Sequence, residues 1–349
     1  MSRKSAYYEA PFPIYSADWT GSFGGGSSLI AVGSYSESSS NKVQVINANP
    51  ILENSHNSAP KTTFEFQQSA EAAIPYPSTR IMWDPHCATS PSAFGSKVRL
   101  ATSGESLRLW EYDNDIKSLN VKCVFSNSKC GSVSPVTSFD WSKVNNNHIV
   151  SSSIDTTCTV WDLNTAQAKT QLIAHDKEVY DVKYTAGSDD VFVSVGADGS
   201  IRVFDLRALD HSTIIYEPAN PVPLVRLSTN PMDSNTLAAI AANENEVYIL
   251  DIRSPGVPIA MLKGHKAPVN SVIWAPPNCS FGGAGATRKS ILATASDDCQ
   301  VLVWDVTGDN PQVVAAYSDS TEFNNLTWGA DGDWIGAVSD RSIQGIRLI

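Results

Sequence analysis

One phrase recurs along this chain of 349 residues, and it restricts the possible folds more than any other feature. The phrase is an apolar stretch, an acidic turn, an alternating strand, and then an aromatic residue or Leu followed by an acid. Three clear copies and two weaker ones end at Trp161-Asp162, Phe204-Asp205, Trp304-Asp305, Trp110-Glu111 and Leu250-Asp251. Successive anchors are 51, 43, 46 and 54 residues apart, which indicates a repeat of about 40–45 residues with loop insertions. A unit of this length cannot bury its apolar face alone, so neighbouring units must pack against one another.

A second element precedes each copy and predicts an inner strand. It alternates with a period near two and is rich in Val, Ile, Thr and aromatic residues, which is the signal of a β-strand. It occurs seven times, at residues 16–19, 79–83, 136–141, 179–184, 224–227, 269–274 and 323–328. No stretch offers a long apolar stripe of helical period. Seven four-stranded units of WD-repeat length predict an all-β, seven-bladed WD-repeat β-propeller, with residues 1–349 as a single domain.

The two ends of the chain predict how the ring closes. The seventh unit begins at Phe323 and supplies inner strands only, so its outer strand must come from another part of the chain. Residues 6–11 precede the first inner strand and are placed to pair with the last strand, which removes two open sheet edges. We therefore expect deletion of residues 1–12 to destabilise the whole ring.

Four segments rich in Gly, Ser, Asn, Pro and Ala are predicted to be solvated loop insertions, at residues 21–28, 47–73, 85–96 and 278–289. The run from Gly283 to Ser290, which begins in the last of them, differs by one residue from a phosphate-binding loop. Arg288 stands where that loop needs Gly for close approach of the backbone to phosphate. The segment also precedes a strand, whereas a phosphate-binding loop follows one. We interpret it as a flexible insertion.

The most regular units carry four residues at matching positions. These are His175, Ser194, Asp198 and Phe204 in the fourth unit, and His265, Thr294, Asp298 and Trp304 in the sixth. In WD-repeat proteins such residues join a loop to the strands by hydrogen bonds, whereas an isolated His, Ser and Asp would suggest a catalytic triad. Their recurrence in two units favours a structural polar network. Phe204 lacks the indole N–H donor, the third unit has Ser132 in the His position, and the second has Gly104 in the Asp position.

Charge and cysteine usage argue against several functions. With 25 Lys and Arg against 36 Asp and Glu, the net charge is −11, which disfavours direct binding to nucleic acid or to an anionic membrane. The six cysteines form no Cys-x-x-Cys pair and no His pair has zinc-finger spacing, so we expect reduced thiols and no metal or other cofactor. No signal peptide, membrane span or common catalytic motif is visible. These features predict a soluble, intracellular protein that is not an enzyme.

Several runs resemble one family almost word for word. They include residues 137–141, 152–161, 170–181, 195–200, 204–207, 211–217, 224–227, 249–255 and 274–276. The chain resembles the WD-repeat adaptors of the anthocyanin-regulator or Transparent Testa Glabra group, whose animal members are known as cullin-ligase-associated factor seven. It departs from that family in the insertions 47–73 and 278–289 and in its final strand.

The resemblance implies a non-catalytic scaffold or adaptor in the nucleus and the cytoplasm. Its implied clients are protein kinases of the dual-specificity tyrosine-regulated type, or basic helix–loop–helix and MYB transcription factors, in transcriptional and developmental regulation. An alternative role, also implied by the resemblance, is that of a substrate receptor of a cullin-RING ubiquitin ligase.

The ligase role depends, in the family, on a box of Trp, Phe or Leu followed by Asp, any residue and Arg. The matching residues here are Phe204, Asp205, Arg207, Leu250, Asp251 and Arg253. An Arg just past a third strand lies near the rim of the ring. Its guanidinium group either docks on an acidic ligase surface or bonds to the Asp of its own blade, and both interpretations stay open.

Loops at one face of the propeller are the candidate seats for protein partners. The candidate residues are Asp176, Lys177, Glu178, Tyr180 and Lys266, in the segments 175–180 and 264–268, together with the acidic turns near Asp155, Asp198 and Asp298. The acidic surplus suits basic segments of partners, because long-range attraction steers such segments toward the ring. We expect a monomeric ring that binds proteins and neither nucleic acid nor membrane.

Overall fold

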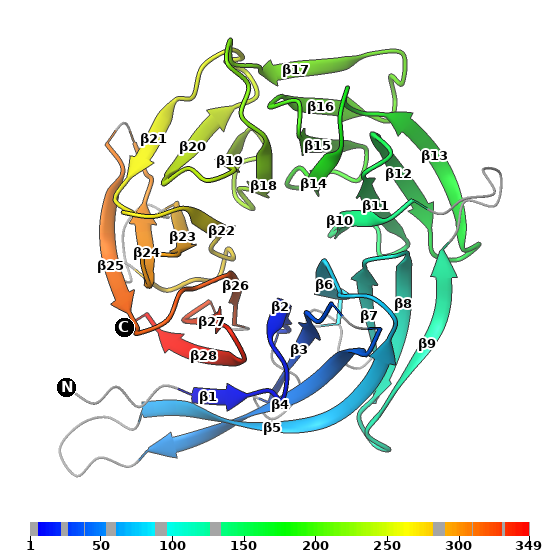
Figure 1. Cartoon of the computed structure of the whole chain (residues 1–349), viewed down its shortest axis with the longest axis vertical. Coiled ribbons are helices and arrows are strands. Elements are labelled where there is room, and N and C mark those ends of the chain that lie inside the picture. The colour runs from blue at the N-terminus through cyan, green and yellow to red at the C-terminus, as the bar shows by residue number, and fades with distance from the viewer. Residues whose placement is uncertain are drawn as a thin grey trace.

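The computed structural model describes residues 6–21, 27–37, 39–53, 61–87, 96–125, 134–281, 290–308, 310–329 and 332–348. Within these ranges the chain forms seven four-stranded antiparallel sheets and no helix. The sheets stand as blades around a central opening and follow one another in chain order (Figure 1). The predicted all-β, seven-bladed WD-repeat propeller is confirmed.

Six blades are built from four consecutive strands each. Blades 1 to 3 consist of β2 Ile14–Trp19, β3 Ser28–Ser34, β4 Asn41–Glu53 and β5 Lys61–Ile74; β6 Arg80–Trp83, β7 Lys97–Ser103, β8 Leu107–Asp113 and β9 Ser118–Phe125; and β10 Val136–Trp141, β11 His148–Ser153, β12 Thr157–Asp162 and β13 Gln167–Ile173. Blades 4 to 6 consist of β14 Val179–Tyr184, β15 Val191–Gly196, β16 Ile201–Asp205 and β17 Ser212–Tyr216; β18 Leu224–Thr229, β19 Thr236–Ala241, β20 Glu246–Asp251 and β21 Ala260–Lys263; and β22 Val269–Trp274, β23 Ile291–Ser296, β24 Gln300–Asp305 and β25 Gln312–Ser318. Blade 7 consists of β26 Asn325–Trp328, β27 Trp334–Ser339, β28 Ser342–Arg347 and β1 Ala6–Glu9.

The seven predicted inner strands are β2, β6, β10, β14, β18, β22 and β26, and they surround the opening (Figure 1). Behind them, the described apolar side chains form seven buried clusters, and each cluster joins two neighbouring blades. One example unites Trp83 and Tyr112 of blade 2 with Val43 and Val45 of blade 1. The core therefore lies between the blades, and each blade depends on its neighbours for burial of its apolar faces.

The ring closes as the chain ends predict. Strand β1 pairs antiparallel with β28, in a register from Ala6 opposite Gly345 to Glu9 opposite Ser342. The backbone N–H of Ala10 continues the contact by donating to the Arg341 carbonyl at 2.7 Å. Since β1 precedes blade 1 in the chain and belongs to blade 7 in space, it links the two ends of the ring.

The prediction of a loop at residues 47–73 is wrong for the described parts of that segment. Strands β4 and β5 pair along their whole length, from Asn41 opposite Ile74 to Glu53 opposite Lys61, and form a long hairpin that runs past β1 (Figure 1). Phe64 of this hairpin is buried against blade 7 and Glu65 beside it is exposed, so the segment alternates as a strand does. Its content of Asn, Gln, Ser and Ala conceals this alternation. Residues 22–26, 54–60, 88–95 and 282–289, within the predicted insertions, lie outside the described residues.

Candidate functional site

The connections between strands lie on two opposite faces of the ring. In an antiparallel blade, the turn between the second and third strands lies at the same end as the entry to the inner strand. We call this end the first face, and it holds the segments 175–180 and 264–268 and the acidic turns at Asp155, Asp198 and Asp298. The second face holds the turns that follow the inner strands and the turns between third and fourth strands. Arg207 and Arg253 lie on this second face.

In blade 4, a buried histidine joins the entry loop to the strands. The Nδ1 atom of His175 lies 3.0 Å from both carboxylate oxygens of Asp198, and its Nε2 atom lies 2.8 Å from the Oγ atom of Ser194. The backbone N–H of Asp176 donates to Asp198 at 3.2 Å. The Nη2 atom of Arg202 donates to both Asp176 and Asp198, at 2.8 and 3.2 Å. These bonds fix the backbone at the start of the loop.

Blade 6 repeats the arrangement with one more donor. The Nδ1 atom of His265 lies 2.9 and 3.1 Å from the two carboxylate oxygens of Asp298, and its Nε2 atom lies 2.7 Å from Thr294 Oγ1. The indole N–H of Trp304 donates to the same Thr294 oxygen at 2.9 Å. The backbone N–H of Lys266 donates to Asp298 at 2.9 Å, so this entry loop is also fixed.

The residue before each histidine matches the size of the ring beneath it. A Cβ atom on Gly264 would lie only 2.7 Å from Cη2 of Trp304, so the indole requires glycine there. In blade 4 the matching position is Ala174, which is fully buried, and Phe204 replaces the indole. The Phe204 ring stacks on Phe192 with 5.0 Å between centroids. Blade 4 has therefore lost the indole donor and filled part of the space with a methyl group.

The His and Ser residues of the blade 4 network are not accessible to a substrate. His175 is 1 % exposed and Ser194 is 0 % exposed. Burial lowers the pKa of His175 and of His265, although the neighbouring carboxylates act in the opposite direction, so the neutral imidazole is favoured. This geometry supports the structural interpretation. Ser132, at the His position of blade 3, lies outside the described residues, and Gly104 of blade 2 has no side chain to contribute.

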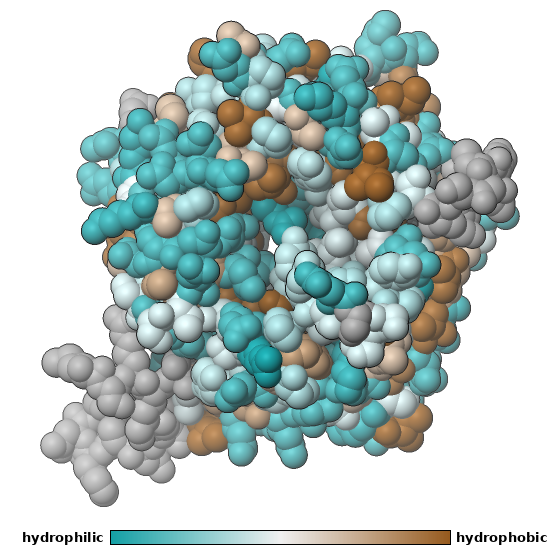
Figure 2. All heavy atoms as spheres, in the orientation of Figure 1, coloured by the Kyte–Doolittle hydropathy of each residue, from teal (hydrophilic) through white to brown (hydrophobic). Residues whose placement is uncertain are grey.

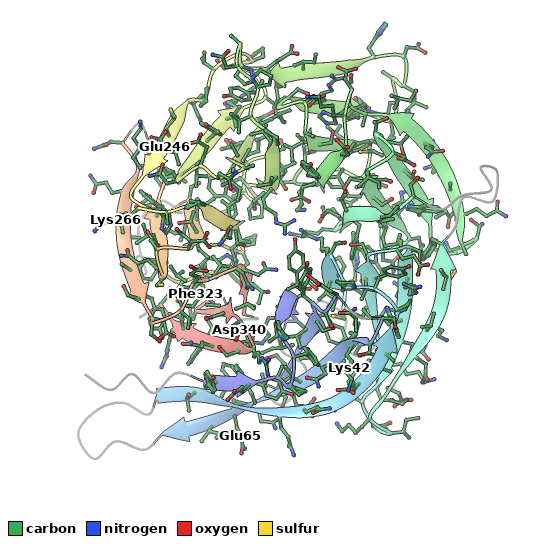
Figure 3. The ribbon with its side chains drawn as sticks, in the orientation of Figure 1. Lys42, Glu65, Glu246, Lys266, Phe323 and Asp340 are labelled. Atoms are coloured by element: carbon green, nitrogen blue, oxygen red, sulfur yellow. The ribbon has the colours of Figure 1, made fainter. Side chains whose placement is uncertain are left out.

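The predicted partner loops present charged side chains on the first face. Asp176, Lys177, Glu178 and Lys266 are exposed, and Tyr180 is half-buried at the start of β14. The face seen in Figure 2 is largely hydrophilic and is hollowed at the ring centre. Lys266 lies at the outer side of blade 6, close to blade 5 with Glu246 (Figure 3). These side chains point into solvent from loops whose first residues are held by the histidine networks.

The two ligase-box motifs adopt one geometry on the second face. The Arg207 Nε and Nη2 atoms donate to the Asp205 carboxylate at 2.8 and 2.6 Å, and Arg253 pairs with Asp251 at 2.9 and 2.5 Å. The side-chain hydrogen bond from Arg207 lowers the pKa of Asp205 to about 2. Phe204 and Leu250 are buried, whereas the arginines are 68 % and 65 % exposed. Each Arg thus bonds to the Asp of its own blade and still faces solvent.

The central channel contains a set of residues that the sequence analysis missed. Each inner strand is the free edge of its sheet, so its N–H groups need partners from outside the sheet. In four blades, the polar side chain just before the terminal residue of the inner strand accepts a hydrogen bond from a backbone N–H in the next blade. These pairs are Asp18 with Trp83 at 2.8 Å, Asp140 with Tyr184 at 2.9 Å, Ser228 with Trp274 at 3.3 Å, and Thr327 with Trp19 at 3.0 Å.

Two further contacts of this kind are made by side chains that lie two residues earlier in their inner strands. Asp181 accepts from the N–H of Leu227 at 2.9 Å, and Ser271 accepts from Leu326 at 3.2 Å. A polar residue directly before the final aromatic residue, as in Asp18-Trp19, was the available sequence signal. The ladder of side chains holds neighbouring blades together at the centre of the ring.

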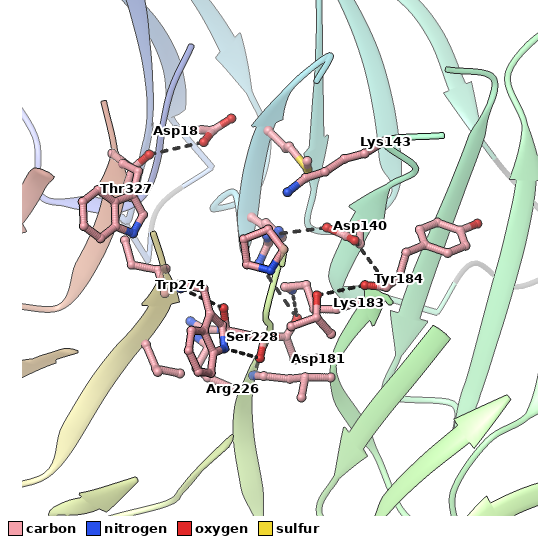
Figure 4. A pocket seen from close by; sticks show the side chains of 18 of the residues that line it. Asp18, Asp140, Lys143, Asp181, Lys183, Tyr184, Arg226, Ser228, Trp274 and Thr327 are labelled. Atoms are coloured by element: carbon pink, nitrogen blue, oxygen red, sulfur yellow. Dashed lines mark hydrogen bonds and ion pairs between the residues drawn. The ribbon is translucent and has the colours of Figure 1, made fainter. Parts of the chain in front are cut away.

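The channel widens into a cavity of about 530 Å³ that reaches the turns of the second face. Its lining includes four cationic and three carboxylate side chains, namely Arg80, Lys143, Lys183, Arg226, Asp18, Asp140 and Asp181. Figure 4 shows several of them converging from neighbouring strands, with Lys143 reaching over the same space. The cavity is in the size range of small-molecule sites.

Burial and neighbouring charges shift the ionisation of this cluster. Burial raises the pKa of Asp18 to about 6, although the N–H of Trp83 and the charge of Arg80 act against this. Burial would also raise the pKa of Asp181, but the charges of Lys183, Arg80 and Arg226 hold it at about 2. Burial, together with the charge of Arg80, lowers the pKa of Lys183 to about 8.

Within the described ranges, no group of three or more His, Cys, Asp or Glu side chains is arranged to hold a metal ion. The same part of the chain has no helix that is long and apolar enough to cross a membrane.

Comparison with known proteins defines the family. The model of the WD domain, G-beta repeat, matches residues 167–205 and 256–305. The DDB1- and CUL4-associated factor 7 homolog of Dictyostelium discoideum is 39 % identical over 353 residues, which cover 100 % of both chains. This chain belongs to the WD-repeat family of the DDB1- and CUL4-associated factor 7 homologs. The chain is also similar to WD repeat-containing proteins of two yeasts. The protein of Saccharomyces cerevisiae is 36 % identical over 98 % of this chain and 76 % of the relative, and that of Schizosaccharomyces pombe is 39 % identical over 95 % of this chain and 76 % of the relative.

The two segments matched by the repeat model contain the two histidine networks described above. Residues 167–205 include His175 and Asp198, and residues 256–305 include His265 and Asp298. The general WD-repeat pattern is therefore strongest where the first-face loops are held, and the similarity to the factor 7 homologs extends around the entire ring.

Proposed function

We propose that this protein is a non-catalytic adaptor that brings other proteins together on one ring. The observation that carries the proposal is the placement of two exposed charged surfaces on opposite faces of the same ring, in blades 4 and 6 on the first face and in blades 4 and 5 on the second. The first-face loops are held by the networks of His175 and His265, and the second face carries Arg207 and Arg253. Loops on a rigid scaffold are well suited to binding, because little motion must be lost when a partner docks. The inaccessibility of Ser194 supports a non-catalytic role.

A substrate receptor of a cullin-RING ubiquitin ligase is the second candidate function. It is favoured by the name of the Dictyostelium relative, which describes that protein as associated with DDB1 and CUL4. It is also favoured by the exposure of Arg207 and Arg253, since an arginine that is bonded to its own blade keeps outward N–H groups for a partner carboxylate. In this function the second face docks on the ligase and the first face holds the substrate.

We propose protein kinases of the dual-specificity tyrosine-regulated type, and basic helix–loop–helix and MYB transcription factors, as clients of the first face. The family resemblance supports these clients and a location in nucleus and cytoplasm. The net charge of −11 supports basic client segments, because electrostatic steering raises their association rate.

Affinity purification of three forms of the full chain tests the proposal. The wild type is compared with the second-face variant Arg207→Ala/Arg253→Ala and the first-face variant Lys177→Ala/Glu178→Ala. Lys263→Ala serves as the control, because Lys263 is an equally exposed, ion-paired cation that lies on the outer strand β21.

We expect the second-face variant to lose ligase subunits and keep kinases or transcription factors, and the first-face variant to show the reverse. The adaptor proposal fails if the wild type recovers neither clients nor ligase subunits. The ligase function alone fails if clients are recovered without any ligase subunit.

A further inference from the structure

The channel cavity contains arginines whose donors are largely unused. The guanidinium group of Arg80 lies 4.0 Å from Asp140 and 3.9 Å from Asp181, and it donates no hydrogen bond to any described residue. Its Nε–H is buried without a partner among the described residues. Among the described residues, Arg226 donates one hydrogen bond, 3.4 Å long, to the hydroxyl of Tyr15 on the other side of the channel. A guanidinium group offers five donors, so both side chains retain most of their capacity.

Two carboxylates of the cavity, Asp140 and Asp181, lie within ion-pair distance of Arg80, but the hydrogen bonds that they accept come from other groups. Asp181 accepts from Ser138 Oγ at 2.6 Å, from Lys183 Nζ at 2.6 Å and from the N–H of Leu227 at 2.9 Å. Asp140 accepts the N–H of Tyr184 in the neighbouring blade. These bonds fix the carboxylates in the walls, so the arginines face the space of the cavity with donors to spare.

Asp18 is held in the wall in the same manner. It accepts from the N–H of Trp83 at 2.8 Å and from the hydroxyl of Thr327 at 3.3 Å. The Asp18 carboxylate therefore has partners on both oxygens without the help of an arginine.

The charge of the cavity is opposite in sign to that of the chain. Four cations, Arg80, Lys143, Lys183 and Arg226, face three carboxylates, which gives 4 − 3 = +1, whereas the chain as a whole carries −11. Lys143 is exposed at the mouth on the second face and forms no ion pair with a described residue. A positive site inside low-dielectric walls concentrates small anions.

We propose that this cavity binds a small phosphate-class anion, held by the guanidinium groups of Arg80 and Arg226 and reached through the mouth at Lys143. Guanidinium forks match the oxygens of phosphate, and such charge-assisted hydrogen bonds are among the strongest in proteins. A phosphate group offers three or more oxygens to cations that come from blades 2, 3 and 5, whereas a carboxylate offers two. The volume of about 530 Å³ exceeds that of inorganic phosphate and leaves room for an organic phosphate. This site is separate from the protein-binding surfaces proposed above and does not depend on them.

Calorimetric titration of the full chain tests this proposal, at constant ionic strength. The probes are inorganic phosphate, pyrophosphate and adenosine monophosphate, and sodium chloride is the reference. We expect binding of at least one phosphate probe, with a rise in melting temperature of about 3–4 °C at about 100 times its dissociation constant. Binding of inorganic phosphate as tightly as the nucleotide identifies the free anion as the ligand, and tighter binding of the nucleotide identifies an organic phosphate.

Substitutions then locate the binding site. Arg80→Met and Arg226→Met should each weaken binding about 10- to 100-fold. Lys143→Met, which removes an exposed side chain and should leave folding unchanged, should weaken it several-fold. Arg207→Met is the matched control on the same face and should bind as the wild type does. Absence of binding up to about 10 mM, or binding unaffected by Lys143→Met and by every folded arginine variant of the cavity, would overturn the proposal.

Discussion

Replacing Phe64 with Ala should loosen the ring at the junction between blades 1 and 7. Phe64 lies on β5 of blade 1, is 7 % exposed, and packs edge-to-face on two tryptophans. Its ring centroid lies 5.2 Å from that of Trp334 in blade 7 and 5.4 Å from that of Trp19 in blade 1. The side chain thus holds the long hairpin against the strands of blade 7.

The magnitude follows from these contacts. Loss of the buried phenyl group costs about 2–3 kcal/mol, and each edge-to-face contact adds about 0.5–1.5 kcal/mol. The sum of about 3–6 kcal/mol agrees with the range for Phe→Ala in well-packed cores. With an unfolding entropy of about 2 cal/mol/K per residue, a chain of this length should melt about 4–8 °C lower.

Thermal melting and hydrogen exchange together test the reasoning. Glu65→Ala, at the exposed neighbouring position, should change stability by less than about 0.5 kcal/mol and serves as the control. In Phe64→Ala, exchange of the β1 amides that pair with β28 should rise more than exchange in blade 4. A melting temperature equal to that of Glu65→Ala would show that the hairpin does not stabilise the ring. Equal increases in exchange at β1 and blade 4 would show that Phe64 supports the whole fold and not this junction.

Three further predictions concern other parts of the ring. Deletion of residues 1–12 should lower the melting temperature and cause association through the exposed β28 edge, visible by size-exclusion chromatography; an unchanged melt contradicts the closure role. Burial raises the pKa of Asp18 to about 6 in the folded chain, above its value in the unfolded chain. Protonation of Asp18 therefore stabilises the fold; this stabilisation is complete below about pH 4 and is lost as the pH rises through 6. The free energy of unfolding of Asp18→Asn, measured with urea, should therefore rise relative to that of the wild type by about 1–1.5 kcal/mol between pH 5 and pH 8. A difference between the two proteins that stays constant over this range refutes the reasoning. Gly264→Ala should destabilise blade 6 by about 1–3 kcal/mol, and Phe204→Trp should be tolerated only together with Ala174→Gly; equal melting of the single and double variants would contradict the size argument.

The closure of the ring was predictable from the sequence because it depends on a simple count. The last unit lacks an outer strand, and the strand expected before the first inner strand belongs to no other unit. Pairing of β1 with β28 was therefore the arrangement that completes the last blade. The inner strands were predictable because each alternates over four to six residues and most end at an aromatic residue. Both inferences use information within one repeat or at the chain ends.

The long hairpin was not predictable in the same way. Its residues Phe64 and Phe66 stand among Thr, Glu and Gln, and Trp334, the blade 7 partner of Phe64, is about 270 residues away in the chain. Only the closed ring brings blade 7 next to blade 1, so the reason for these two aromatic residues lies outside their own repeat. The polar composition of the segment is typical of loops, and that resemblance led to the wrong prediction.

The channel shows why comparison of the seven blades with one another identifies structural residues more readily than the residues of a binding site. Where the position before the strand end holds Asp, Ser or Thr, its oxygen binds the next blade, and this recurring use marks the residue as structural. The informative positions are the exceptions, because a scaffold does not require them. Arg80 and Arg226 occupy positions that hold Ser in three other blades, and they leave donors unused where Ser271 completes the ladder. The other blades thus serve as the comparison for each blade, and the positions at which one blade departs from the shared polar pattern are the ones to test for function.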